Sequence, residues 1–139
     1  GPVIDQEAKQ NLENHKANMR KVARAYVELE APTNGHFVAP AVYLLDNLNQ
    51  LQREVFGPIL HIVRYKKENL VNVLNEVNAK GYALTGGCHS RIRKQMDLVE
   101  KHLHCGNFYI NRNIVGAVVG VQPFGGQARK PVVNSICNV

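Results

Sequence analysis

Apolar residues recur at helical spacing near the start of the chain, directly after a residue that can cap a helix. Asp5 suits the N-cap position because its carboxylate can accept hydrogen bonds from the first free backbone N–H groups of a helix. The repeat that follows predicts a helix from about Gln6 to Arg24. The positions that share its inner face are Ala8, Leu12, His15, Met19, Val22 and Ala23.

Further along the chain, short apolar runs alternate with segments of helical spacing. The runs predict an edge strand at Tyr26–Glu30 and further strands at Phe37–Leu44, Ile59–Tyr65, Tyr82–His89 and Phe108–Ile110. The helical spacing predicts helices at Glu68–Asn78 and Ile92–His102, and a short helix or turn at Leu48–Val55 that ends at Gly57. Pro32–Gly35 is typical of a turn, and Gly81 stands where a glycine commonly follows a helix.

The order strand, helix, strand, helix, strand indicates parallel pairing through right-handed crossovers. The sequence therefore predicts an α/β fold, with an open, mainly parallel sheet and flanking helices. The phosphate-binding patterns G-x-G-x-x-G and G-x-x-x-x-G-K-[ST] are both absent. Nothing in the chain therefore marks it as the dinucleotide-binding half of an enzyme.

With 139 residues, the chain is long enough for one domain or for a part of one. It has no apolar run of about 20 residues and no charged-then-apolar leader, so we expect no integral membrane segment and a cytoplasmic location. The formal net charge is +6. The basic residues are dispersed and no aromatic residues alternate with them, so we expect no specific nucleic-acid partner. We interpret the basic residues of the predicted helices, Lys16 among them, as solvated faces or as a surface that met acidic parts of a missing domain.

The three cysteines, Cys88, Cys105 and Cys137, have no C-x-x-C spacing. Their odd number favours free thiols in a reducing compartment. Cys88 and Cys105 lie in apolar strand contexts, where burial raises the pKa of a thiol and leaves little thiolate. The sequence His102-x-His104-Cys105 lacks the repeated short spacing of a zinc site, so we predict no metal.

The segment Arg53–Pro58 reads R-E-V-F-G-P and leads directly into an apolar run. A carboxylate can accept two hydrogen bonds from a diol, and an aromatic ring two residues away can pack against a flat heterocycle. The segment resembles the E-x-F-G-P motif of the aldehyde dehydrogenase superfamily, in which the glutamate holds the nicotinamide ribose and the phenylalanine packs beside it. The resemblance implies that Glu54 and Phe56 bind the cofactor. The alternative is a helix end with a Gly-Pro turn, in which Glu54 pairs with Arg53 and Phe56 packs in the core.

A second segment, Asn111–Gly126, reads N-R-N-I-V-G-A-V-V-G-V-Q-P-F-G-G. It resembles the glutamate-γ-semialdehyde (Δ1-pyrroline-5-carboxylate) dehydrogenase module of bifunctional proline utilisation A proteins. The resemblance implies that Gly116 and Ala117 anchor the substrate carboxylate and that Phe124 borders the substrate pocket. The alternatives are a flexible glycine-rich connection and a buried ring that closes the core. The likeness covers residues 1–126, whereas residues 127–139 depart from the family pattern as a divergent tail.

The resemblance implies that this chain is the C-terminal part of an aldehyde dehydrogenase catalytic domain. The family nucleophile lies upstream of Gly1–Asp5, so we expect no catalytic residue here, no activity of the chain alone and no NAD bound to it, although the parent enzyme uses NAD. The expected partners are the missing portion of the enzyme or a second copy of the chain. A non-catalytic interaction domain that retains the fold is the alternative function.

Overall fold

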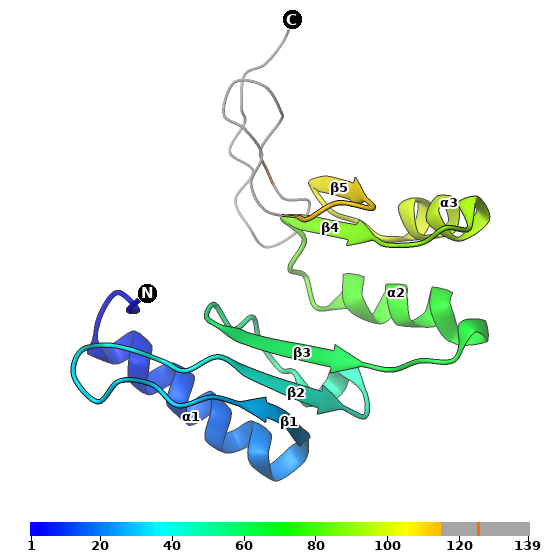
Figure 1. Ribbon diagram of the computed structural model, residues 1–139. Helices are drawn as coiled ribbons and strands as arrows, with labels where there is room; N and C mark the ends of the chain where they lie inside the picture. The colour runs from blue at the N-terminus through cyan, green and yellow to red at the C-terminus, as the bar shows by residue number, and fades with distance from the viewer. Residues whose placement is uncertain (115–124, 126–139) are drawn as a thin grey trace, which may run out of the picture. The chain divides into compact units, whose positions relative to one another are not determined.

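The computed structural model describes residues 1–114 and Gly125, and the chain divides into two compact units, residues 1–64 and residues 65–139 (Figure 1). The first unit contains α1 (Gln6–Val22), β1 (Arg24–Glu28), β2 (Ala41–Leu45), the 3-10 helix η1 (Leu48–Gln50) and β3 (Ile59–Val63). The second unit contains the 3-10 helix η2 (Lys67–Asn69), α2 (Leu70–Ala79), β4 (Thr85–Cys88), α3 (Arg93–His102) and β5 (Asn107–Ile110).

Helix α1 begins as the sequence predicts. The Asp5 side chain accepts a hydrogen bond from the backbone N–H of Ala8 at 2.7 Å, which satisfies one of the free donors of the first turn. The helix ends at Val22, two residues before the predicted end, because Ala23 adopts an extended conformation with φ of −135°. The chain passes from there directly into β1.

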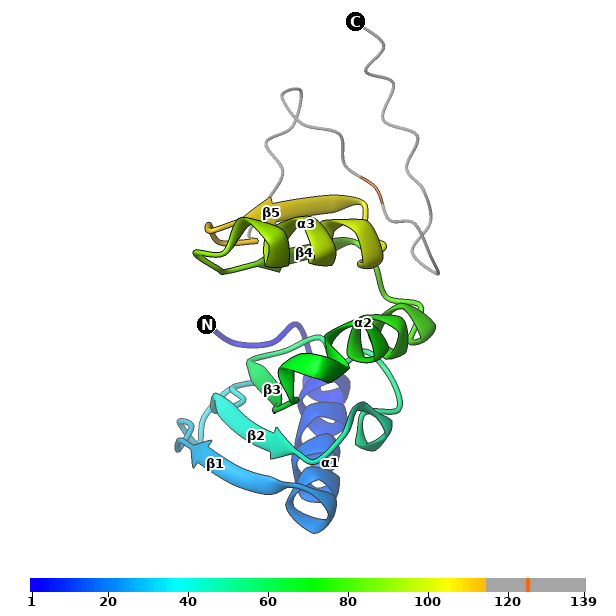
Figure 2. The ribbon, with the colours of Figure 1, turned by 90° about the vertical axis from the view of Figure 1, so that its right-hand side faces the viewer.

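The three strands of the first unit form one sheet in the order β1, β2, β3. β1 runs antiparallel to β2, with a bulge between Ala25 and Val27, and β3 runs parallel to β2. Helix α1 lies along this sheet in both ribbon views (Figures 1 and 2). The core between them consists of Met19, Ala41, Tyr43 and Leu45. β2 therefore carries the most deeply buried side chains of the unit.

Two predicted strands of the first unit are displaced. The edge strand predicted at Tyr26–Glu30 lies at Arg24–Glu28, and the strand predicted from Phe37 begins only at Ala41. Pro40 has no N–H to donate to a ladder, whereas the N–H of Ala41 donates to the Pro58 carbonyl at 3.1 Å and begins the pairing with β3. Val38 and Ala39 are buried without belonging to the strand, because burial does not require a ladder.

The segment Leu48–Val55, predicted as a short helix or turn, contains one 3-10 turn. Asn47 and Gln50 form a capping box, in which the Asn47 side chain accepts from the N–H of Asn49 at 3.0 Å. The Gln50 side-chain oxygen in turn accepts from the backbone N–H of Asp46 at 2.7 Å. Residues 51–58 then have no regular secondary structure.

In the second unit β4 and β5 pair in parallel, and α3 connects them. This confirms the parallel pairing predicted across that helix. The Asn78 side chain at the end of α2 donates to the His102 carbonyl at 2.7 Å and accepts from the His104 N–H at 2.9 Å, which fixes α2 to the end of α3. Gly81 has a φ of +74° and follows the helix, as predicted.

The strand predicted at Tyr82–His89 is shorter than expected, since only Thr85–Cys88 forms β4. The carbonyls of Ala83 and Leu84 accept hydrogen bonds from Gly106 and Asn107 at 2.9 and 3.1 Å, but the regular register with β5 starts at Thr85. The α/β class predicted from the sequence is confirmed, and two of the three strand pairings in the described residues are parallel.

Candidate functional site

The loop of residues 51–58 joins η1 to β3 and is held firmly at its second half. The Pro58 carbonyl accepts from Ala41 at 3.1 Å, and the N–H of Ile59 donates to the Gly57 carbonyl at 2.8 Å. Ala41 and Ile59 are also the first pair in the register of β2 with β3. The sheet therefore fixes the point at which this loop enters β3.

Gly57 lies directly on α1. A Cβ atom at this position would be 2.6 Å from Cδ2 of Leu12, closer than side-chain atoms normally come. Leu12 is buried, with 4% of its surface exposed, so its side chain has little room to move. A residue without a side chain is thus required here by the contact between the loop and the helix.

The same loop presents a carboxylate and an aromatic ring at the surface. Phe56 is 93% exposed, and Glu54 is also exposed. The alternative interpretation, in which Phe56 packs in the core, is therefore wrong. The described residues show both predicted cofactor contacts on one anchored loop, whereas the predicted substrate contacts Gly116, Ala117 and Phe124 lie outside the described residues.

Behind the loop, two histidines join α1 to β3. Nε2 of His15 lies 2.9 Å from Nε2 of His61, so one imidazole donates its proton and the other accepts it. Burial lowers the pKa of both rings, and the positive charge of Arg53 further lowers the pKa of His15. The pair therefore favours the neutral forms, in which one N–H is shared between the two elements.

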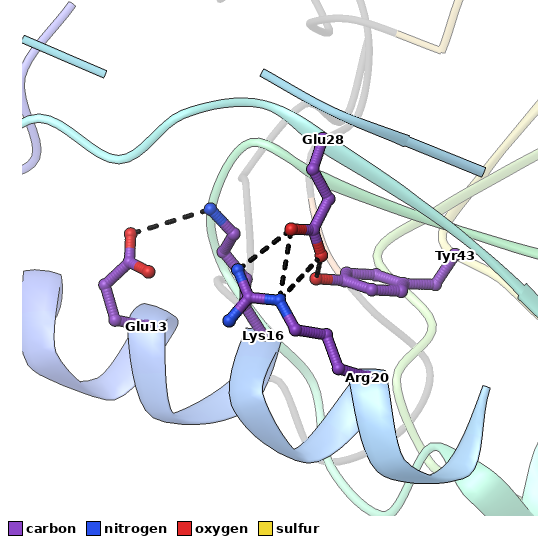
Figure 3. A network of polar contacts seen from close by, with 5 residues as sticks. All are labelled: Glu13, Lys16, Arg20, Glu28 and Tyr43. Atoms are coloured by element: carbon purple, nitrogen blue, oxygen red, sulfur yellow. Dashed lines mark hydrogen bonds and ion pairs between the residues drawn. The ribbon is translucent and has the colours of Figure 1, made fainter. Parts of the chain in front are cut away.

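A second polar network joins α1 to β1 and β2 (Figure 3). The Arg20 guanidinium donates to both carboxylate oxygens of Glu28, at 2.9 to 3.1 Å, and the hydroxyl of the fully buried Tyr43 donates to the same carboxylate. These hydrogen bonds, that of Arg20 first, lower the pKa of Glu28. Burial, followed by the contact with Glu28, raises the pKa of Tyr43. The network stabilises the packing of the first unit and contains no exposed nucleophile.

Lys16 departs from the predicted solvated face of the helix. It is 4% exposed, lies 3.7 Å from Glu13 and is close enough to Glu28 to lower the pKa of that carboxyl (Figure 3). A lysine can be buried in this way because its charge has carboxylates nearby.

Residues 1–129 match the model of the aldehyde dehydrogenase family. This chain belongs to the aldehyde dehydrogenase family. It is 48% identical over 130 residues to the bifunctional protein PutA of Rhizobium meliloti, a match that covers 91% of this chain and 11% of that protein. It is 35% identical over 129 residues to the 1-pyrroline-5-carboxylate dehydrogenase of Geobacillus sp. (strain WCH70), with 91% of this chain and 25% of that protein covered.

Solved structures of similar proteins share the fold of this chain. A crystal structure of bifunctional proline utilization A is 52% identical, with a TM-score of 0.88, over 92% of this chain and 13% of that one. The 1-pyrroline-5-carboxylate dehydrogenase from Thermus with bound NAD is 34% identical, with a TM-score of 0.81, over 92% of this chain and 25% of that one. This chain thus spans about a tenth of its PutA relatives and a quarter of the 1-pyrroline-5-carboxylate dehydrogenases.

The two cysteines of this aldehyde dehydrogenase chain that the structure describes are half-buried free thiols in the second unit. Burial raises the pKa of Cys105, as the sequence predicts. Cys88 lines a cavity of about 320 Å³ at the end of β4, together with His89 and Lys67. Cys137 lies outside the described residues.

Within residues 1–114 and Gly125, no three side chains of His, Cys, Asp or Glu come together as a metal site. None of the helices in this described part is both long enough and apolar enough to cross a bilayer.

Sequence reasoning placed His15 on the inner face of its helix but missed its partner, His61. His61 could have been singled out by its position in the middle of an otherwise apolar strand, where an imidazole needs a hydrogen-bonding partner. Glu28 and Tyr43 gave no such signal, because a glutamate and a tyrosine are ordinary residues for an edge strand and its neighbour.

Proposed function

We propose that this chain is part of the catalytic domain of an NAD-dependent aldehyde dehydrogenase that oxidises glutamate semialdehyde to glutamate in proline breakdown. The names of its relatives, PutA and 1-pyrroline-5-carboxylate dehydrogenase, support this substrate and pathway. The Thermus relative, whose structure contains NAD, supports the cofactor. The small share of these relatives that the chain spans supports its being a part of the enzyme.

The observation that carries the proposal is the exposure of Glu54 and Phe56 on a loop that Gly57 anchors against Leu12. A ring that is 93% exposed contributes little to folding, so its place directly before the anchored Gly57 favours a ligand. An ionised carboxylate accepts hydrogen bonds from both hydroxyls of a ribose, and the ring can cover one face of the nicotinamide. NAD would then supply the hydride acceptor, while Glu54 and Phe56 orient its reactive end.

The rest of the site lies elsewhere in the proposed enzyme. The resemblance implies that the cysteine nucleophile and the nucleotide-binding domain lie upstream of Gly1, and we assign the rest of the site to them. Without that domain the pyrophosphate and adenine of NAD lack their contacts at a helix N-terminus. The chain by itself should therefore bind NAD weakly or not at all, and calorimetry that showed micromolar affinity would contradict this.

The test is a chimera in which this chain replaces the matching segment of the Rhizobium meliloti PutA. We expect the chimera to reduce NAD with 1-pyrroline-5-carboxylate. Glu54→Gln and Phe56→Ala should each raise the KM for NAD by about tenfold, as expected when a charge-assisted hydrogen bond or a stacking contact is lost. Glu76→Gln, at an exposed glutamate on α2, and Tyr26→Ala, at an exposed tyrosine on β1, are the matched controls.

A folded chimera without activity would refute the assigned reaction. A chimera that is active but equally insensitive to all four substitutions would show that Glu54 and Phe56 do not bind the cofactor. Near-ultraviolet and far-ultraviolet circular dichroism establish that each chimera is folded before its activity is compared.

The second candidate, an interaction domain without catalysis, is favoured by the apolar surface of β3. Leu60 is 56% exposed and Ile62 is 36% exposed, on one face of a strand whose other residues are half-buried. This face suits either a partner protein or the remainder of the enzyme. An active chimera would favour the enzyme, whereas an inactive chimera together with a monodisperse complex of the isolated chain would favour the interaction domain.

A further inference from the structure

A cavity of about 570 Å³ lies in the first unit, alongside the second half of α1 and the residues that precede Glu54. This volume is within the range of pockets that hold small molecules. Its apolar part comes from Met19 and Val22, and its amide side chains come from Asn14, Asn18, Gln50 and Gln52. It therefore offers a short aliphatic surface surrounded by hydrogen-bond donors and acceptors.

The charge of this cavity is entirely positive. Lys21 and Arg53 line it and no acidic residue does. Among residues 1–114 and Gly125, neither cation has a carboxylate partner within 4 Å. The other cations of this part of α1 differ, since Lys16 and Arg20 pair with Glu13 and Glu28 (Figure 3). Lys16 and Arg20, whose charges are paired with carboxylates, thus lie on the sheet side of the helix. Lys21, which has no such pair in the described part of the chain, lies at the cavity.

The charge of Arg53 acts on the interior of the cavity. His15 lines the cavity, is 8% exposed, and has its pKa lowered by burial first and then by the Arg53 charge. A cation close enough to disfavour a second positive charge is also close enough to attract an anion placed between them. The carbonyl of Val22 at the negative end of α1 already accepts a hydrogen bond from the Gln50 side chain, so this acceptor does not meet an anion unpaired.

We propose that this cavity binds a small organic anion with one or two carboxylates. Lys21 and Arg53 hold the carboxylates from two different elements, Asn18 and Gln52 donate amide N–H groups, and Met19 with Val22 contacts the aliphatic part. A carboxylate suits this lining better than a phosphate, because no helix N-terminus with free backbone N–H groups contributes to it. The site belongs to the first unit alone and does not depend on the function proposed above.

The experiment is a titration of the 139-residue chain with succinate, followed by ¹H–¹⁵N correlation NMR. We expect succinate to cause saturable chemical-shift changes at the amide signals of α1 and of the segment 50–53. Succinamide, which has the same shape without the charges, should leave these signals unshifted. Arg53→Gln and Lys21→Gln should each weaken succinate binding by about tenfold. Succinate should also raise the pKa of His15, because it offsets the Arg53 charge.

Two further variants make the test decisive. Lys94→Gln removes an exposed cation on α3 and should leave succinate binding unchanged. Asn18→Asp places a carboxylate inside the cavity, where it should abolish succinate binding while the chain stays folded. Absence of saturable shifts, equal shifts with succinamide, or equal weakening by Lys94→Gln would each overturn the proposal. Stronger binding of inorganic phosphate than of succinate at the same residues would overturn the choice of a carboxylate ligand.

Discussion

Nε2 of His15 on α1 lies 2.9 Å from Nε2 of His61 on β3, although the two residues are 46 positions apart in the chain. Only one of the two rings can donate along this line, so the contact requires at least one neutral imidazole. Arg53 faces His15 as a further cation, and the ring of Tyr43 lies beside His61 with a centroid distance of 6.4 Å. The junction of helix and sheet is thus sensitive to protonation.

The free energy of unfolding should fall as the pH is lowered from about 7.5 to about 5.5. The pKa of each histidine is lower in the folded chain than the ordinary 6.5, so the unfolded chain takes up protons first. The stabilisation is complete above 6.5 and is lost as the pH falls through the folded pKa. Urea unfolding at several pH values measures the slope of the free energy of unfolding against pH.

His15→Gln should reduce this slope, and the double variant with His61→Gln should remove most of it. His104→Gln, at an exposed histidine of the second unit, is the control and should leave the slope as it is. A slope that survives in the double variant would show that other groups titrate in this range.

Gly57→Ala should destabilise the chain by about 1–3 kcal/mol, the usual cost of forcing an extra group into a filled site. The added Cβ would lie 2.6 Å from Leu12 Cδ2. In a Leu12→Ala background the same substitution should cost much less, because the obstructing methyl groups are absent. Urea denaturation of the unmodified chain, the two single variants and the double variant gives the coupling free energy between positions 12 and 57. If the losses in the free energy of unfolding were additive, the two residues would not collide.

Glu28→Gln should destabilise the chain by about 1–2 kcal/mol, since the carboxylate accepts hydrogen bonds from Arg20 and from the buried Tyr43. The pKa of Glu28 is lowered from its ordinary 4.5, so its stabilisation is present above that value and is lost as the pH falls through the folded pKa. Glu30→Gln, two residues away and exposed, should change neither stability nor acid sensitivity. Thermal unfolding at neutral and acidic pH distinguishes the two variants.

The isolated chain should not reduce NAD with glutamate semialdehyde. Of its described cysteines, the half-buried Cys105 has a raised pKa because partial burial disfavours its thiolate, and the family nucleophile is expected upstream of this chain. Absorbance of NADH is the measurement. Turnover that disappeared on Cys88→Ala or Cys105→Ala would show that the catalytic cysteine lies here.

The chain should self-associate, most simply as a two-fold dimer. Leu60 and Ile62 expose an apolar face of β3, and β1 is exposed along its whole length as an edge strand. Sedimentation at micromolar concentration should show a species heavier than the monomer. Leu60→Lys should shift it toward the monomer, whereas Ile4→Lys, at an exposed isoleucine outside the sheet, should not. A monodisperse monomer of the unmodified chain would contradict the prediction.

The sequence alone determined the features that depend on neighbouring residues. The cap at Asp5, the helices α1 and α3, the turn glycine Gly81 and the α/β order all follow from local spacing and backbone preferences, and the structure confirms them. The E-x-F-G-P motif could also be recognised in the sequence, because its residues are contiguous. Strand ends were less accurate, since the ladder partner rather than the apolar run decides where pairing stops, as at Ala41 and Thr85.

Only the tertiary structure decided which distant side chains meet. His15 forms a hydrogen bond with His61, 46 positions away, and Tyr43 forms one with Glu28, 15 positions away. Gly57 packs against Leu12. Lys16 is buried although its position on the helix suggested a solvated face, because nearby carboxylates offset its charge. Such contacts depend on the register of the sheet and the placement of α1 on it, which no local pattern encodes.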